Sequence, residues 1–272
     1  AGAAIAATAG AAAAAPLEVV RVDKHPEGDR EVSITVVARV KGSDPARLLR
    51  CLKQRSDRGL PMTGDPRRVF AALRFTDKQE RTLQACTVKD CKFNFPPFGR
   101  RQLQAAGSLD KKKAVYRQLV HRLTVMANKK GKRRRIRPAH VTPSQPCARA
   151  AAFRALLEGP VRSGDHLVWR RLRGTSRMRP TLITAQLRTW KAGSSHCLGR
   201  TLLFADHYFM DYLELIQVTA AGDGKLELRF HHRTQIDLLN SWLLRRFKYK
   251  LRNQIIGEAR RLLGRWVRRC TR

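Results

Sequence analysis

The chain has 272 residues, which is long enough to bury a sizeable core as one large domain or two small ones. A hydrophobic content of 43% argues against wholesale disorder, and no run of about 18 uncharged apolar residues marks a transmembrane helix. With 56 lysines and arginines against 21 acids, the formal net charge is +35, which favours polyanionic partners: nucleic acid, anionic lipid headgroups or acidic glycans. The alternative is a basic surface that is merely solvated.

The first 16 residues, AGAAIAATAGAAAAAP, are rich in alanine and end in small residues before Pro16. This composition resembles the end of a secretory signal peptide, with cleavage options around Ala13–Ala15. We therefore expect an exported protein, periplasmic or extracellular. A disordered mature N-terminus or a linker would explain the same composition.

Residues 31–41, EVSITVVARVK, alternate between apolar and polar side chains. Val32 and Ile34 would face one side, and Ser33 and Thr35 the other, so the pattern predicts a half-buried strand. The next segment predicts a helix with Asp44 as its N-cap.

Two further helices are predicted before the first strongly basic run. Thr76 and Gln79 are placed as a capping box for the first of them. Residues 93–101, FNFPPFGRR, predict a loop, because two consecutive prolines do not fit a regular element. A long helix then begins at Asp110, with apolar residues every three or four positions.

Seven of the nine residues in Lys129–Arg137 are basic, so they repel one another and predict an exposed loop. A shorter helix, CARAAAFRALLE, follows. From Leu167 onward the sequence predicts short strands rich in leucine, valine, threonine and aromatic residues. The segment AAGDGK predicts a hairpin turn between the last two strands.

The chain ends in one long predicted helix with an apolar stripe at helical spacing. The stripe consists of Leu244, Phe247, Leu251, Ile255, Ala259, Leu262, Trp266 and Cys270. We therefore predict an α+β fold in which a curved antiparallel sheet grips this helix, with a helical insertion at about 60–160 between the first strand and the meander. Residues 17–272 would form a single domain after the N-terminal 16.

The six cysteines are too few to suggest a disulfide scaffold for a chain of this length. Cys86 and Cys91 are close enough to form a disulfide in an oxidising compartment, and their spacing is not the C-x2-C of zinc sites. The other four are scattered and are expected to be single, small core residues: Cys51, Cys147, Cys197 and Cys270.

Three stretches, LQACTVKDCKFNF, LLFADHYFMDYLEL and FHHRTQIDLLNSWLLRRFKYKLRNQIIGEARRLL, resemble segments of an uncharacterised family of exported bacterial proteins with a paired-cysteine motif. The order of elements also resembles the helix-grip fold of the START-like superfamily, whose members carry lipids and small apolar ligands. This resemblance implies a space between sheet and helix that holds an apolar or amphipathic ligand.

The stretch FADHYFMDYLEL sets Asp206, His207 and Asp211 among large apolar residues, and is either a site or a turn between two strands. Aromatic side chains with a polar handle suit the wall of a ligand cavity, although the same residues also suit an ordinary core. The candidates for the cavity wall are Tyr208, Phe209, Tyr212, Phe230 and Trp242.

Basic residues of the loop and the last helix are candidates for an anionic membrane surface or, with no sequence specificity, nucleic acid. They are Lys129, Lys130, Lys132, Arg133, Arg134, Arg135, Arg137, Arg245, Arg246, Lys248, Lys250 and Arg252. The alternative function is therefore a polyanion-binding structural protein associated with RNA or the ribosome.

No catalytic motif is present, so we expect binding rather than catalysis, with no cofactor. We also expect no metal, because the adjacent His231 and His232 would point to opposite faces of a strand. Arg233 and Asp237 are placed to form a structural ion pair where the last strand meets the terminal helix.

Overall fold

The computed structural model describes most of the chain, as residues 17–24, 31–56, 58–59, 65–129, 146–159, 165–172, 180–236 and 248–271. Several predicted features lie outside these ranges and stay predictions. They are the alanine-rich N-terminus, Asp237, Trp242, Arg245, Arg246 and the basic loop residues Lys130, Lys132, Arg133, Arg134, Arg135 and Arg137.

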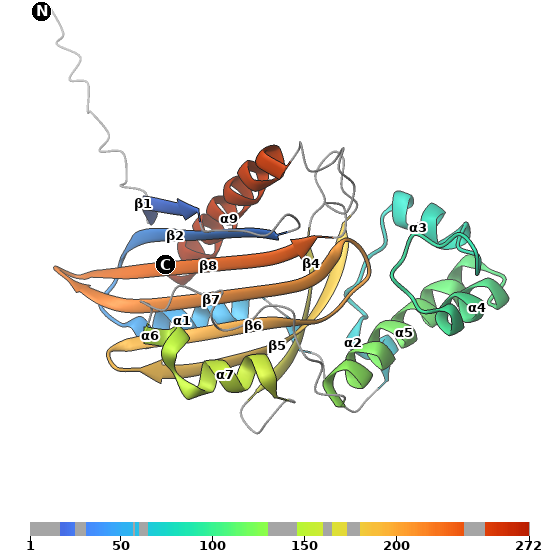
Figure 1. The fold of residues 1–272 in the computed structure, drawn as a ribbon, viewed down its shortest axis with the longest axis horizontal. Helices are drawn as coiled ribbons and strands as arrows, with labels where there is room; N and C mark the ends of the chain where they lie inside the picture. The colour runs from blue at the N-terminus through green and yellow to red at the C-terminus, as the bar shows by residue number, and fades with distance from the viewer. Residues whose placement is uncertain are drawn as a thin grey trace, which may run out of the picture.

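A single curved sheet runs through the molecule (Figure 1), with every neighbouring pair of strands whose register is known antiparallel. The strand order is β1-β2-β8-β7-β6-β5-β4-β3. The predicted α+β class with a curved antiparallel sheet and a C-terminal helix is thus confirmed. The strands are β1 (Leu17–Lys24), β2 (Glu31–Lys41), β3 (Arg58–Gly59), β4 (His166–Leu172), β5 (Thr181–Ala192), β6 (Ser195–Ala205), β7 (Phe209–Gly222) and β8 (Lys225–Ile236).

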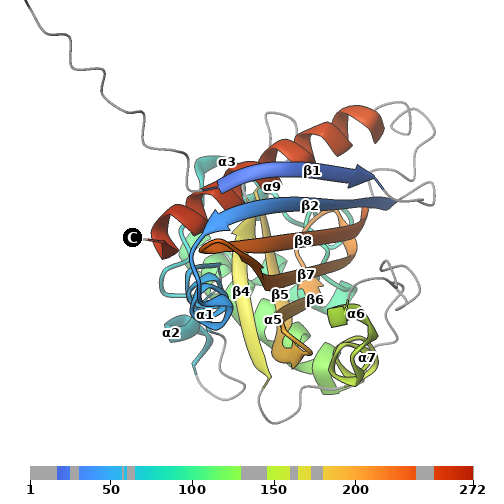
Figure 2. The same cartoon turned by 90° about the vertical axis from the view of Figure 1, so that its left-hand side faces the viewer.

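Helices cover both faces of this sheet (Figure 2). We call the face covered by α1 and α9 the α9 face, and the opposite face, covered by α6, α7 and the helices α2 to α5, the α7 face. The helices are α1 (Pro45–Ser56), α2 (Pro66–Val69), α3 (Asp77–Gln84), α4 (Pro97–Ala105), α5 (Leu109–Lys129), α6 (Pro146–Arg149), α7 (Ala151–Glu158) and α9 (Lys248–Cys270). None of the described helices is long and apolar enough to cross a membrane.

The core of the α9 face joins the long terminal helix to α1 and to the central strands of the sheet. Ile216 and Phe230 of the central strands pack in one buried cluster with Leu52 of α1 and with Leu263 and Val267 of α9. The predicted apolar stripe of the terminal helix is confirmed from Ile255 onward. It omitted Leu263 and Val267, which are the most deeply buried residues of this helix. This face of the helix is what holds it on the sheet.

The α7 face contains two further apolar clusters. Phe153 and Leu157 of α7 pack against Leu213 and Leu215 of β7. In the helical insertion between β3 and β4, α2 to α5 pack on the β4, β5 and β6 end of the sheet through Tyr116, Leu119, Leu182 and Leu203, among other residues. Because helices pack on both faces of the sheet, the central strands are buried on both sides along much of their length.

Gly199 of β6 shows how closely α7 approaches the sheet. A Cβ at this position would lie 2.4 Å from Leu156 of α7 and 2.8 Å from the ring of Trp190. Only glycine leaves room for this contact between helix and strand.

Several local sequence predictions are confirmed. The Asp44 carboxylate accepts a hydrogen bond from Arg47 N–H at the start of α1, and Thr76 and Gln79 form the capping box of α3. In the β7–β8 hairpin, the two turn residues Asp223 and Gly224 both have positive φ, as a type I′ turn requires.

Other predictions are wrong. The strand β2 is not half-buried, since Ser33 and Thr35 are buried as completely as their apolar neighbours. Residues 93–101 are not entirely a loop, because α4 begins at Pro97, where a missing N–H costs no hydrogen bond. The hydroxyl of Ser108, one residue before α5, accepts the Lys111 N–H, so Asp110 only contributes a first-turn charge.

Three disulfides involve all six cysteines, and they overturn the prediction that four of these are single core residues. Cys51 of α1 is bonded to Cys270 at the end of α9, which links the two helices of the α9 face. The disulfide Cys147–Cys197 fixes α6 to the α7 face, and Cys86–Cys91 closes a short loop as predicted. Pairs separated by 219 and 50 residues cannot be read from sequence spacing.

We predict that the double variant Cys51→Ser/Cys270→Ser loses more stability than Cys86→Ser/Cys91→Ser. Loop-closure entropy assigns about 5 kcal/mol to a loop of roughly 220 residues and about 2 kcal/mol to one of roughly 6. Denaturant unfolding of both variants measures the difference. Equal losses would show that this linkage does not hold the terminal helix in place.

Candidate ligand-binding site

A buried charged cluster lies on the α9 face, centred on Glu214 of β7. The strand register places Glu214 between Arg200 of β6 and His232 of β8. Its carboxylate accepts hydrogen bonds from Arg200 Nη1 and from Arg170 Nη2 of β4, the latter at 2.7 Å, and His232 Nδ1 lies 3.6 Å away. The side chains of Arg200 and Glu214 are 0% and 2% exposed, so this pair is fully removed from water.

The arginines decide the charge of Glu214. Burial alone would raise the pKa of this carboxyl, but attraction to Arg170 and Arg200 and the nearby His232 outweigh burial and lower the pKa to about 2. Glu214 is therefore ionised at neutral pH. Among the described residues, the guanidinium groups of Arg170 and Arg200 both pair with this one carboxylate.

Aromatic rings continue from the charged cluster. The ring of Tyr212 contacts Phe209 at 6.3 Å and His232 at 5.2 Å between centroids, and His232 in turn stacks on Phe230. The guanidinium of Arg170 lies 5.3 Å from the centre of the Tyr212 ring. Three of the five predicted wall residues, Phe209, Tyr212 and Phe230, are thus brought together.

The hydroxyl of Tyr212 is the unusual group in this cluster. The residue is completely buried, yet its O–H has no hydrogen-bond partner among the described residues. A buried hydroxyl without a partner costs about 1–3 kcal/mol relative to one that is satisfied. A bound molecule with a polar group at this position would recover that free energy.

Apolar surface flanks the charged cluster along the same strands. On one side Leu198 and Ile216 belong to the core that packs against α1 and α9. On the other side Ile183 and Leu202 form a small apolar group with Tyr212. A polar centre between two apolar regions suits a ligand that has both a polar group and an apolar body.

The stretch FADHYFMDYLEL is a turn between β6 and β7, and its first polar residue anchors the insertion. Asp206 Oδ2 accepts the Tyr116 hydroxyl at 2.5 Å, and Oδ1 accepts the Leu182 N–H at 2.8 Å. The Asp206 carbonyl accepts the Asn94 N–H at 2.8 Å. One residue thus joins α5, the segment before α4 and strand β5.

The pKa of Asp206 is shifted in the direction opposite to that of Glu214. Burial raises it from 3.8 to about 7, although the hydrogen bonds from Tyr116 and from Leu182 N–H act against the increase. Burial and the charge of Asp206 also raise the pKa of Tyr116. Near neutral pH Asp206 therefore exchanges a proton within the contact that holds the insertion.

The other predicted residues of this turn lie with the insertion. His207 stacks on Phe93 with 4.8 Å between centroids, and Tyr208, at φ +56°, contacts His207. Tyr208 therefore lies in the turn, away from the ring contacts of Tyr212. No group of three or more potential metal ligands occurs in the part of the chain that the structure describes.

His231 and His232 point to opposite faces, as predicted: His231 contacts the Thr35 hydroxyl, while His232 contacts Glu214. Arg233 forms an ion pair with Glu31 across β8 and β2. Its predicted partner, Asp237, lies outside the described residues, so that pairing stays a prediction.

Of the predicted polyanion surface, Lys250 is exposed and Arg252 is half-buried on α9. Lys129 lies in α5 and Lys248 lies in α9, and their side chains are outside the described part of the structure. Four more arginines of α9 are exposed and had not been singled out: Arg260, Arg261, Arg268 and Arg269.

Sequence reasoning missed the three residues that define the cluster: Arg170, Arg200 and Glu214. A usable signal exists for Glu214, since it shares one side of its strand with Tyr212 and Ile216, both fully buried. A charged residue that lies on the same face of a strand as buried apolar residues indicates a buried ion pair or a functional site. No comparable signal identifies which arginines reach it, because they come from other strands.

No protein-family model matches the chain, and no curated protein sequence is similar to it. The interpretation of the site therefore depends on its geometry.

We predict that Glu214→Gln destabilises the protein by about 3–5 kcal/mol, because two buried guanidinium groups lose their carboxylate. Chemical denaturation at neutral pH measures the loss. The matched control is Glu227→Gln, which removes a half-exposed partner of Arg229 and should cost less than about 1 kcal/mol. The wild-type contribution of Glu214 should be complete above its unfolded pKa of 4.5 and disappear as pH falls towards 2.

We predict the opposite pH dependence for Asp206. Because its folded pKa is raised, the folded state binds the extra proton, so stability falls as pH rises from 3.8 to about 7. Asp206→Asn keeps an acceptor for Leu182 and a polar partner for Tyr116 but cannot ionise. Its stability relative to wild type should therefore rise across this interval.

Unfolding free energies at several pH values between 4 and 8 test this expectation. Asp110→Asn, which removes an exposed carboxylate of α5, is the matched control and should leave the pH dependence unchanged. A constant difference between Asp206→Asn and wild type over the whole interval would contradict the assignment.

Proposed function

We propose that the protein is a non-catalytic binding protein for an amphipathic, lipid-like ligand, held on the α9 face between the sheet and the terminal helix. The observation that carries this proposal is the buried Tyr212 hydroxyl without a described partner. It lies beside Arg170 and Glu214 and between two apolar regions. The ligand's polar group would bind at the charged cluster, and its apolar body along the flanking side chains.

The arrangement of elements supports the same proposal. A strand and a helix precede the insertion, an antiparallel meander follows it, and the terminal helix packs across the same face as the first helix. This order resembles the helix-grip fold of START-like carriers, which place their ligands between sheet and helix. Fold alone does not fix function, so the proposal depends on the cluster.

Export is part of the proposal. Three disulfides, two of which bridge distant parts of the chain, favour an oxidising compartment such as the periplasm or the exterior. They also weigh against the alternative of a cytosolic RNA-associated protein, which is supported by net charge alone. The exposed basic residues of α9 would attract the protein to an anionic membrane at about 1 kcal/mol each.

We predict that purified protein extracts a fluorescent fatty acid from phosphatidylcholine vesicles, and that Tyr212→Phe weakens retention about three- to tenfold. The substitution removes only the hydroxyl, which is worth about 0.5–1.5 kcal/mol in a neutral hydrogen bond. Tyr249→Phe is the matched control, because Tyr249 is exposed, and it should retain the probe like wild type. Fluorescence of the protein fraction after vesicle removal gives the retained amount.

A second arm of this experiment tests membrane docking. Adding phosphatidylserine should accelerate extraction by wild type, and Arg268→Gln/Arg269→Gln should lose most of that acceleration. Failure of wild type to retain the probe, or equal retention by Tyr212→Phe, would contradict the carrier function. Co-purification of RNA with a steep salt dependence, and no retained probe, would favour the polyanion-binding alternative.

A further inference from the structure

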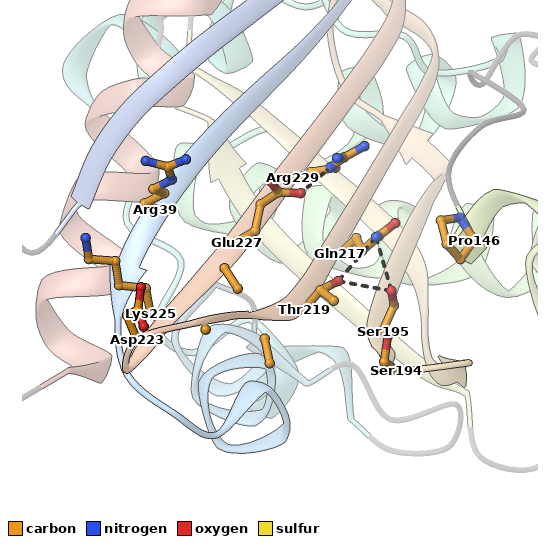
Figure 3. Close-up of a pocket in the computed structure, with 13 residues that line it drawn as sticks. Arg39, Pro146, Ser194, Ser195, Gln217, Thr219, Asp223, Lys225, Glu227 and Arg229 are labelled. Atoms are coloured by element: carbon orange, nitrogen blue, oxygen red, sulfur yellow. Dashed lines mark hydrogen bonds and ion pairs between the residues drawn. The ribbon is translucent and has the colours of Figure 1, made fainter.

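A pocket lies on the α7 face of the sheet, which is the face opposite to that of the charged cluster (Figure 3). It occupies the end of the sheet where the β5–β6 and β7–β8 hairpins turn, next to the first residue of α6, and has a volume of about 640 Å³. This volume is in the range of about 300–1,000 Å³ that is typical of small-molecule sites. Its lining differs from an ordinary apolar pocket because most of it is polar.

The floor of the pocket is built by strand register. Thr219, Glu227 and Arg39 lie opposite one another on β7, β8 and β2, and Gln217 lies opposite Arg229 two residues further along. Side chains two residues apart on a strand share a face, so these two rows lie next to each other. Four strands thus present one polar surface, with Ser195 of β6 at its edge.

Gln217 carries an unsatisfied acceptor in this floor. Its amide nitrogen donates to the hydroxyls of Ser195 at 3.1 Å and Thr219 at 3.3 Å, which also contact each other at 3.0 Å (Figure 3). Gln217 is only 5% exposed, and its buried carbonyl oxygen Oε1 has no hydrogen-bond partner in the described part of the chain. A ligand that donates an O–H group here would satisfy it.

The charges at the pocket are unequal. Arg229 is paired with Glu227 at 2.6 Å, while Arg39 and Lys225 have no ion pair with any described residue. Together with Asp223 this gives three cations against two carboxylates. Two free cations beside a polar floor would bind an anionic group more favourably than a neutral one.

We propose that this pocket binds an acidic sugar, a saccharide unit that carries a carboxylate. Sugar hydroxyls both donate and accept, which suits the Gln217 carbonyl, the hydroxyl of Thr219 and the Glu227 carboxylate at the same time. The sugar carboxylate would bind to Arg39 and Lys225. A simple inorganic anion would leave the Gln217 acceptor unsatisfied, and an apolar molecule would leave the whole floor without partners. The site is independent of the carrier function proposed for the other face.

Ligand-observed NMR with D-glucuronate, D-glucose and acetate tests the proposal. Glucuronate should bind about tenfold more tightly than either glucose, which lacks the charge, or acetate, which lacks the hydroxyls. Arg39→Gln should weaken glucuronate about tenfold and leave glucose unchanged. Arg101→Gln, which removes an exposed cation of α4 on the distant insertion, is the matched control and should not affect either sugar.

A second variant separates the sugar contact from the charge. Thr219→Val keeps the shape of the side chain and removes a hydroxyl of the floor, so it should weaken glucuronate and glucose alike and leave acetate unchanged. Acetate binding as tightly as glucuronate would overturn the sugar assignment. Equal weakening by Arg101→Gln and Arg39→Gln would show that overall charge, and not the pocket, attracts the ligand, and no binding of glucuronate would reject the site.

Discussion

The antiparallel register of β6, β7, β8 and β2 decides where most residues of the charged cluster and of the polar pocket lie. On the α9 face it aligns Arg200, Glu214 and His232 in a row across three neighbouring strands. On the other face it aligns Gln217 with Arg229 at the end of the same strands. Because side chains alternate, a shift of one residue in the pairing of any of these strands would move its side chains to the opposite face of the sheet.

This register is secured by burial on both faces and by covalent links. The disulfide between Cys51 and Cys270 joins the helices of the α9 face, and that between Cys147 and Cys197 holds α6 on the α7 face. The helices therefore remain attached to the sheet without relying only on apolar contact. In a chain with a formal charge of +35, whose basic residues repel one another, such links offset a force that opposes compaction.

The sequence was sufficient for elements whose signals are local. The caps at Asp44 and Thr76 and the Asp-Gly turn each depend on residues within a few positions, and all three were predicted correctly. The α+β class followed from the order of these elements. The strand β1 was missed, because a short stretch at the edge of a sheet has little pattern of its own.

What could not be predicted depends on partners that are distant in sequence. Ser33 is buried as completely as its apolar neighbours, and alternation within one strand cannot indicate whether its second face is covered. The same holds for Cys147 and for Arg170, whose partners are 50 and 44 residues away. Tyr212 lies beside the charged cluster because its strand sets the direction of its side chain, whereas Tyr208 lies in the turn, where its φ is positive.

Glu214 and Asp206 are two buried carboxylates that place opposite demands on the protein. Glu214 stabilises the fold only when ionised, since its pKa is lowered to about 2 by two arginines, whereas Asp206 is favoured in the folded state when protonated, with a pKa of about 7. Mildly acidic conditions therefore satisfy both groups, and alkaline conditions put a buried negative charge at the contact between Tyr116 and the sheet. The charged cluster would then remain intact while the insertion is held less firmly, so pH acts first on the α7 face and leaves the proposed ligand site on the α9 face unchanged.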